Sequence, residues 1–315
     1  SDWLFQMVFC GAACAIVSGC VAERITLWSF LLLCAVLCGI IYPIQGSWGW
    51  GGGWLAEMGV ADYAGSTIVH SVGGWAALTG AIILGARKGK YGKNGRVNPM
   101  PGSNIPMATL GTFILWMGWY GFNGGSVLAL GDAASAIEMG NVIANTNLAA
   151  CGGMIAAMAM VQILYKKVDV TMGLNGALAG LVSITAGPAT PSLGAAILIG
   201  AVGGVLVVLA VPFFDKLKID DVVGAISAHL VAGIWGTLCV GIFGGGSIAT
   251  QAIGIVAIGA FVIVTSSIGW FILKATIGIR VPDRTPRSRA YSFSPMRSKR
   301  PPAPWTSRHR PKCRR

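Results

Sequence analysis

The chain has 315 residues, of which 54% are hydrophobic and only 11% are charged, whereas soluble domains carry about 25% charged residues. So few charges cannot cover a water-exposed surface, and so apolar a chain does not stay disordered, which excludes a soluble enzyme, a soluble binding module and a largely disordered protein. The composition predicts an all-α polytopic membrane protein.

The net charge of +12 is concentrated at one end of the chain. Residues 283–315 hold 11 of the 23 Lys and Arg residues but only one of the 11 Asp and Glu residues. The apolar body, residues 1–282, is therefore close to neutral and has no electrostatic footprint for nucleic acid. We predict a membrane domain over 1–282 and a basic, Arg-, Pro- and Ser-rich cytoplasmic tail over 283–315, either disordered and solvated or bound to anionic lipid.

Nine apolar stretches are long enough to cross a bilayer, which takes about 17–25 helical residues. In chain order they are residues 3–22, 27–46, 65–86, 105–125, 138–164, 170–188, 192–213, 222–243 and 250–273. Glycine occurs in all of them, which suits close packing of membrane helices. The seven cysteines before residue 283 also lie in these stretches, where we expect small apolar residues rather than metal ligands or a disulfide framework.

The loops between these stretches alternate in charge. Lys and Arg are confined to the loops near residues 24, 87–96, 166–167, 216–218 and 274–280, and are absent from 47–64, 126–137, 189–191 and 244–249. By the positive-inside rule the first set is cytoplasmic, so the first stretch runs inward and the C-terminus is cytoplasmic.

Two stretches share a motif and point to an internal repeat. Asp62 to Gly74 and Asp221 to Gly233 both read D-x2-G-x4-H-x-V-[GA]-G. The two stretches run in opposite directions, which predicts an inverted repeat of the kind found in transporters. Since they are five stretches apart, the repeat unit has five, and we expect two further spans before Ser1 and a 5+5 arrangement plus one. Nine as the natural number is the alternative.

The motif carries the two histidines of the apolar body. Ionisable residues inside a membrane are costly and mark pathways or partners, so His70 and His229 are candidate pore residues that could form a bonded pair and relay a proton. Core histidines bonded to backbone are the alternative, and counting residues along each helix leaves a gap between the rings. Asp62 and Asp221 are candidate helix caps, and Asp62 could also attract a cation at the outer mouth.

Aromatic residues gather on the outer side. Trp50 adjoins the run Gly51–Gly53, Phe5 begins the first stretch, and Trp119, Phe122 and Ser126 end the fourth. Such rings are membrane anchors in many proteins, but they also form boxes that hold a cation against their faces.

Together these residues resemble the ammonium transporter family (Amt/Mep/Rh), specifically its Amt branch, over residues 5–282. The stretches that carry the resemblance are A-E-R-I at 22–25, W-G-G-G at 50–53, D-Y-A-G-S-T-I-V-H at 62–70, G-W-Y-G-F-N-G-G-S at 118–126 and G-I-R-V-P at 278–282. The resemblance implies a homotrimer of eleven-helix subunits, each with its own hydrophobic pore. Two family helices are then absent before Ser1. The basic tail also differs from the family's acidic segment, and it is either a divergent tail or a segment translated out of frame.

The resemblance also implies roles for the outer residues. Trp50, Phe5 and Ser126 would recruit ammonium through cation–π contacts and a hydroxyl acceptor. Phe5 and Phe122 would form a stacked gate below that site.

Deeper in the pore, the resemblance makes His70 and His229 the paired histidines and places Trp119 beside the path. Asp62 would be needed structurally and for deprotonation. Moving a bare cation through an apolar constriction is costly, so splitting ammonium into ammonia and a proton would pass ammonia and reject potassium.

We therefore expect an ammonium transporter, with methylammonium as an analogue substrate, in the plasma membrane (the inner membrane if bacterial). We expect no cofactor, no metal and no enzymatic activity, and a PII-type signalling protein as a cytoplasmic partner. The alternatives are an ammonium sensor of the same fold, a non-functional transporter fragment and, least favoured, a neutral-solute channel of the aquaporin kind.

Overall fold

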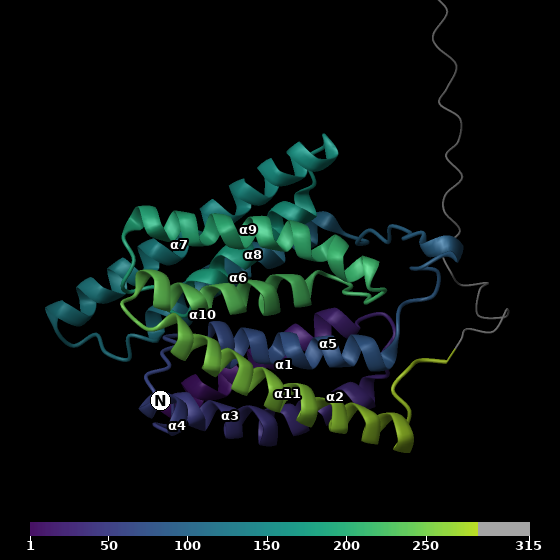
Figure 1. Cartoon of the computed structure of the whole chain (residues 1–315), viewed down its shortest axis with the longest axis horizontal. Coiled ribbons are helices and arrows are strands. Elements are labelled where there is room, and N and C mark those ends of the chain that lie inside the picture. Colours follow the sequence, from purple (N-terminus) through teal and green to yellow (C-terminus); the bar gives the residue numbers. More distant parts are fainter. Residues whose placement is uncertain (283–315) are drawn as a thin grey trace, which may run out of the picture. The chain divides into compact units, whose positions relative to one another are not determined.

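The computed structural model describes residues 1–282, which form long helices joined by loops (Figure 1). Each apolar stretch of the sequence corresponds to one helix or to consecutive helical segments. These are α1 (Asp2–Val21); α2 (Leu27–Val36), η1 (Leu37–Ile41) and α3 (Tyr42–Gly49); η2 (Ser66–Ser71) and α5 (Val72–Leu84); α6 (Ile105–Gly125); α7 (Ala133–Tyr165); α8 (Val170–Ile184); α9 (Leu193–Lys216); η4 (Ile226–Val231) and α10 (Ala232–Phe243); and α11 (Ile248–Thr276). Two short elements, α4 (Trp54–Glu57) and η3 (Lys93–Gly95), lie in the loops.

Seven of these helical segments are long and apolar enough to cross a membrane. The segments α6 and α8 are not among the seven, and α8 has only 15 residues. The all-helical membrane fold is thus confirmed in the described part of the chain, whereas nine crossings remain a prediction. The basic tail, 283–315, lies outside the described residues.

Capping side chains set where several helices begin. The helix α7 begins at Ala133, five residues before the predicted stretch, because Asp132 accepts a hydrogen bond from the backbone N–H of Ser135 at 2.9 Å. Asp169 caps α8 in the same way, through the N–H of Thr171 at 2.8 Å. Hydropathy does not detect such starts, since the first turns of a helix can be polar.

The two motif copies have the same local structure. Gly65 and Gly224 both have positive φ, 104° and 79°, which glycine adopts without a Cβ clash. Each glycine leads into a π-helical segment, η2 or η4, that contains the histidine of its copy. In η2 the N–H of His70 donates to the carbonyl of Gly65 at 2.9 Å, five residues back. The inverted repeat stays a prediction, but the two copies of its motif adopt the same local backbone structure.

Glycine also permits backbone contact among α7, α8 and α9. A Cβ at Gly180 or Gly200 would collide with the carbonyl oxygen of Ala149, and one at Gly204 with that of Gly153. The three helices therefore approach each other with no side chain between them, as in other membrane helix packings.

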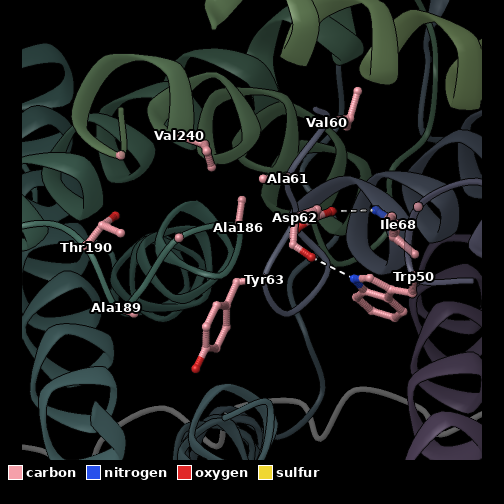
Figure 2. A pocket seen from close by; sticks show the side chains of 13 residues that line it. Trp50, Val60, Ala61, Asp62, Tyr63, Ile68, Ala186, Ala189, Thr190 and Val240 are labelled. Carbon is pink, nitrogen blue, oxygen red and sulfur yellow. Dashed lines mark hydrogen bonds between the residues drawn. The ribbon is translucent and has the colours of Figure 1, made fainter. Parts of the chain in front are cut away.

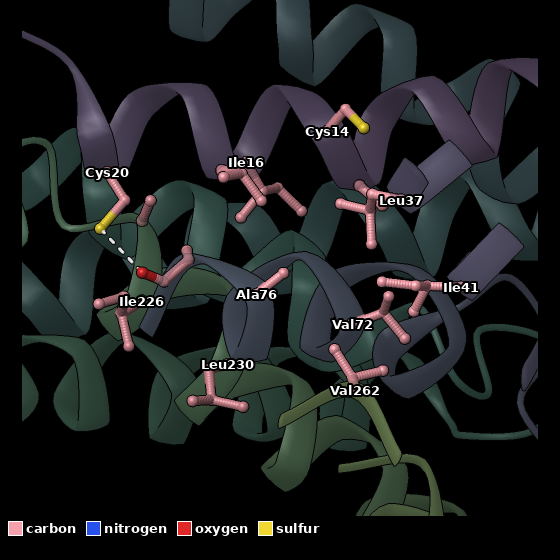
Figure 3. Packing of buried hydrophobic residues seen from close by; sticks show 14 of the residues in the cluster. Cys14, Ile16, Cys20, Leu37, Ile41, Val72, Ala76, Ile226, Leu230 and Val262 are labelled. Carbon is pink, nitrogen blue, oxygen red and sulfur yellow. Dashed lines mark hydrogen bonds between the residues drawn. The ribbon is translucent and has the colours of Figure 1, made fainter. Parts of the chain in front are cut away.

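Around α1, by contrast, larger side chains fill the core (Figure 3). Ile16 of α1, Val72 of α5, Ile226 of η4 and Val262 of α11 belong to one buried cluster. The indole N–H of Trp270 reaches through it to the carbonyl of Ala76 at 3.1 Å. The segments η2 and η4, which carry the two histidines, both contact α1 and α8, and η4 also contacts α9, while α5 packs against α1 and α11.

An arginine cluster ties together the loops that the sequence assigns to the cytoplasm. The guanidinium of Arg24 is buried and donates to the carbonyls of Gly85 and Asp220 at 2.7 and 2.9 Å. Arg87 forms a bidentate pair with the carboxylate of Asp220, in which Nε donates at 2.9 Å and Nη2 at 3.0 Å. Burial alone would raise the pKa of Asp220, but the hydrogen bonds and charge of Arg87 and the charge of Arg24 lower it below its usual value.

Candidate functional site

The two motif histidines meet inside the helix bundle. The Nδ1 atoms of His70 and His229 are 3.3 Å apart, and the ring centroids are 5.3 Å apart at an interplanar angle of 23°. The structure therefore brings the two rings together without the gap expected from counting residues, and both rings lie on π-helical segments. Nε2 of His70 is buried and has no hydrogen-bond partner among residues 1–282.

The imidazole of His70 packs against two aromatic rings of α6 that also pack against each other, with centroids 5.6 Å apart. It stacks on Trp119 with centroids 4.9 Å apart and on Phe122 with centroids 5.3 Å apart. The indole N–H of Trp119 donates to Oγ1 of Thr185 at 2.8 Å. Trp119 thus lies beside both the histidine and Phe122, where the resemblance placed it.

The predicted partner of Phe122 needs a correction. The ring that packs against Phe122 is Phe9, with centroids 4.2 Å apart, whereas Phe5 packs edge-on against Phe9 with centroids 4.7 Å apart. Residues 5 and 9 are one helical turn apart on the same face of α1, and the inner of the two reaches Phe122. Sequence reasoning missed Phe9, although its i,i+4 spacing from Phe5 was a usable signal.

Trp50 lies at the outer end of this row of rings. It packs edge-on against Phe9 with centroids 5.6 Å apart, and its indole N–H donates to the backbone carbonyl of Asp62 at 2.7 Å. Trp50 and Asp62 also line a cavity of about 380 Å³, together with Tyr63, Ile68 and residues of the loop after α8 (Figure 2). The outer residues Phe5 and Ser126 are not part of that lining.

The carboxylate of Asp62 is a helix cap. Oδ1 accepts the N–H groups of Gly65 and Ser66 at 2.9 and 2.8 Å, and Oδ2 accepts those of Thr67 and Ile68 at 2.8 and 2.9 Å. The aspartate is buried and all four donors are at the start of η2. This geometry fits the capping interpretation and leaves neither oxygen pointing freely to the outer mouth.

Ser126 ends α6 near the same rings. Its hydroxyl donates to the carbonyl of Phe122 at 2.8 Å. The neighbouring Gly125 faces the ring of Phe5 so closely that a Cβ there would lie 2.9 Å from it. The hydrogen bonds of Ser126 in the described part of the chain do not reach Trp50.

The result is a continuous row of rings that leads from the C-terminal end of α3 into the bundle, in the order Trp50, Phe9, Phe122, His70 and His229. One proton shared between the two Nδ1 atoms leaves one Nε2 as an acceptor and the other as a donor. Such a pair can bind a small molecule that both donates and accepts. Within residues 1–282, His, Cys, Asp and Glu do not form a group of three or more that could hold a metal ion.

Comparison with known proteins decides the family. The family model described as "Ammonium Transporter Family" matches residues 1–289 of the chain. The chain belongs to the ammonium transporter family. Among its curated relatives, a putative ammonium transporter of Synechocystis is 47% identical over 244 residues, which cover 77% of this chain and 55% of the relative. Ammonium transporter Amt2 of Archaeoglobus fulgidus is 42% identical, with 79% of this chain and 55% of the relative covered.

Solved structures of the family agree with this assignment. A protein described as a sensor Amt protein matches with a TM-score of 0.84 and 39% identity, over 88% of this chain and 72% of that one. Saccharomyces cerevisiae Mep2 matches with a TM-score of 0.79 and 29% identity, over 87% and 65%. This family member is thus a multi-pass, all-helical membrane protein, and it spans about half the length of the first two curated relatives.

Proposed function

We propose that this chain conducts ammonium across the membrane as ammonia plus a separately carried proton. The observation that carries the proposal is the contact between the buried His70 and the half-buried His229, with 3.3 Å between the Nδ1 atoms, at the inner end of a row of aromatic rings. Two histidines in contact inside a helix bundle indicate a function, because ionisable groups are costly in a membrane. Membership of the ammonium transporter family supports the same conclusion.

The outer rings would recruit the cation. Trp50 and Phe5 would offer ring faces for cation–π contact, and Ser126 would offer its hydroxyl oxygen. The Phe9–Phe122 contact would then be the gate, in place of the Phe5–Phe122 contact expected from the sequence. Ammonium that gives up its proton here avoids the cost of carrying a charge past these rings.

The histidine pair would receive the neutral ammonia. Ammonia can donate to the Nε2 lone pair of one ring and accept from the Nε2–H of the other. Exchange of the proton between the two Nδ1 atoms would let the pair carry a proton inward by a separate route. Potassium has no proton to release and would be rejected.

We further infer that the chain works as a homotrimer in the plasma membrane, or in the inner membrane if bacterial, with a cytoplasmic C-terminus. The helix α6 offers a face for assembly, on which five apolar side chains are exposed: Met107, Leu110, Phe113, Ile114 and Met117. Absence of Lys and Arg from the opposite loops supports the orientation. A PII-type signalling protein on the cytoplasmic loops remains part of this proposal.

The test is ammonium-evoked current in proteoliposomes that contain the purified chain. We expect current from the wild type, and none from the variant in which His70 and His229 are both replaced by alanine. The matched control is His309→Ala, since His309 is the third histidine of the chain and lies outside the described residues. Undiminished current from the double variant would overturn the proton-relay step, and silence of the wild type would overturn transport by this chain.

A sensor function is the second candidate, because a similar solved structure is described as a sensor Amt protein. It would be favoured over transport if the wild type gave no current but bound ammonium with a change in unfolding temperature that the double histidine variant lacked.

A further inference from the structure

Four cysteines meet where α1 contacts the second apolar stretch. Cys10 and Cys14 are one turn apart on α1, and Cys34 of α2 and Cys38 of η1 have the same spacing, so each pair lies on one helix face. The thiol of Cys10 donates to the carbonyl of Cys38 at 3.3 Å, and the thiol of Cys14 donates to that of Cys34 at 3.7 Å. The thiols of each segment are thus directed at the other segment.

One pair of sulfurs is in direct contact. Sγ of Cys14 and Sγ of Cys38 are 3.0 Å apart, about 1 Å more than the about 2.04 Å of a disulfide bond. Both cysteines are reduced in this structure. The two sulfurs are therefore already in contact, although the two residues are 24 positions apart in the sequence.

The surroundings favour a covalent link over a bound ion. A soft metal would need three or four thiolates around one point, and the described residues contain no such group. Cys14 is buried, but Cys38 and its neighbours Cys10 and Cys34 are partly exposed. A small uncharged oxidant can reach the partly exposed thiol from the bilayer side, where Gly39 and Ile40 are also exposed.

We propose that Cys14 and Cys38 are a redox modification site that closes to an intramolecular disulfide under peroxide. One thiol is oxidised to a sulfenic acid as hydrogen peroxide is reduced to water, and the second thiol displaces a second water to form the S–S bond. Two thiol hydrogens and two electrons leave the protein in total. The bond ties α1, the helix that carries Phe9, to η1.

The experiment uses the full chain in lipid vesicles, treated with hydrogen peroxide, then denatured and alkylated without reductant. In the peroxide-treated wild type we expect two fewer alkylated cysteines than in the untreated sample and a pair of peptides joined through Cys14 and Cys38. A phosphine reductant should restore full alkylation and separate the joined peptides. The variants C14A and C38A should lose the joined peptides. The matched controls C20A and C34A, on the same two helical stretches, should keep them.

Three results would overturn the proposal. The first is full alkylation of all eight cysteines in wild type at peroxide doses that form a disulfide in a denatured sample of the same chain. The second is sulfinic acid on Cys38 without any joined peptide. The third is a joined peptide that persists in C14A. Because the wild-type peptide map is decisive by itself, the test does not depend on the folding of any variant.

Discussion

The imidazole of His70 lies nearly parallel to the indole of Trp119, with centroids 4.9 Å apart and 16° between the planes. The other edge of the indole is fixed, because its N–H donates to Oγ1 of Thr185 at 2.8 Å. The hydroxyl of Thr185 donates in turn to the carbonyl of Leu181 in α8 at 2.7 Å. The position of His70 therefore depends on a chain of contacts that crosses from η2 through α6 to α8.

The first prediction concerns this chain of contacts. Thr185→Val leaves the buried indole N–H unpaired and should cost about 1–3 kcal/mol of stability. Trp119→Ala removes the ring itself and should cost about 3–5 kcal/mol. Thermal unfolding in detergent measures both, and ammonium-evoked current should fall further in Trp119→Ala, since His70 loses its stacking partner. Equal stability of Thr185→Val and wild type would contradict the role given to the hydrogen bond.

The second prediction separates Phe9 from Phe5. Phe9 is 1% exposed and touches three other rings, whereas Phe5 is partly buried and touches Phe9 alone among the described aromatic contacts. Phe9→Ala should cost about 3–5 kcal/mol and raise the methylammonium concentration needed for half-maximal uptake. Phe5→Ala is the matched control and should do less on both measures. A larger effect at Phe5 on uptake would restore the gate expected from the sequence.

The third prediction addresses the two motif aspartates. Asp62 accepts four backbone N–H groups, whereas the bonds found at Asp221 come from the N–H and the hydroxyl of Ser227. An amide nitrogen at residue 62 would face N–H donors, so Asp62→Asn should sharply lower the yield of folded protein by size-exclusion chromatography, and Asp221→Asn should lower it less. If Asp62→Asn instead folds normally and loses only ammonium current, the carboxylate acts on the substrate and not as a cap.

The fourth prediction is a pH dependence. Arg87 and Arg24 lower the pKa of Asp220 despite its burial, so the carboxylate stabilises the fold fully above the usual aspartate pKa of about 3.9 and loses this contribution as the pH falls through the lowered value. Asp220→Asn should therefore cost about 3–5 kcal/mol at neutral pH and flatten the acid limb of unfolding temperature against pH.

Asp215→Asn is the control for that measurement. Its partner Lys90 lies at 3.0 Å, but the Asp215 side chain is 21% exposed, and such pairs are worth about 0–1 kcal/mol. A loss at Asp215 equal to that at Asp220 would show that total charge, rather than the buried Arg87–Asp220 pair, sets the acid stability.

The sequence predicted the helices and the histidine pair well, for physical reasons. The length of an apolar stretch indicates a membrane helix directly. In each copy of the D-x2-G-x4-H pattern the aspartate caps the helix, the glycine has positive φ and the histidine follows at the same spacing. It could not show that His70 and His229 touch through Nδ1, because a π-helical segment changes which way a side chain points and hydropathy does not detect it.

The ring that contacts Phe122 was predicted wrongly for a related reason. Phe5 and Phe9 share one face of α1, and only the depth at which α6 crosses that face decides which of them meets Phe122. Thr185 was missed because a threonine within an apolar stretch carries no sign of the indole N–H it accepts. The Phe9–Phe122 contact and the Trp119–Thr185 hydrogen bond both depend on how far one helix is shifted along another. Side-chain packing determines that shift.

The glycine contacts among α7, α8 and α9 set the limits of inherited variation in this part of the gene. Every amino-acid change that a single nucleotide substitution can make from a glycine codon adds at least a Cβ. At Gly180, Gly200 and Gly204 that atom would collide with a backbone carbonyl oxygen, which cannot move away by a change of side-chain rotamer. Natural variants should therefore accumulate on the lipid-facing side chains of these helices long before they appear at those three codons.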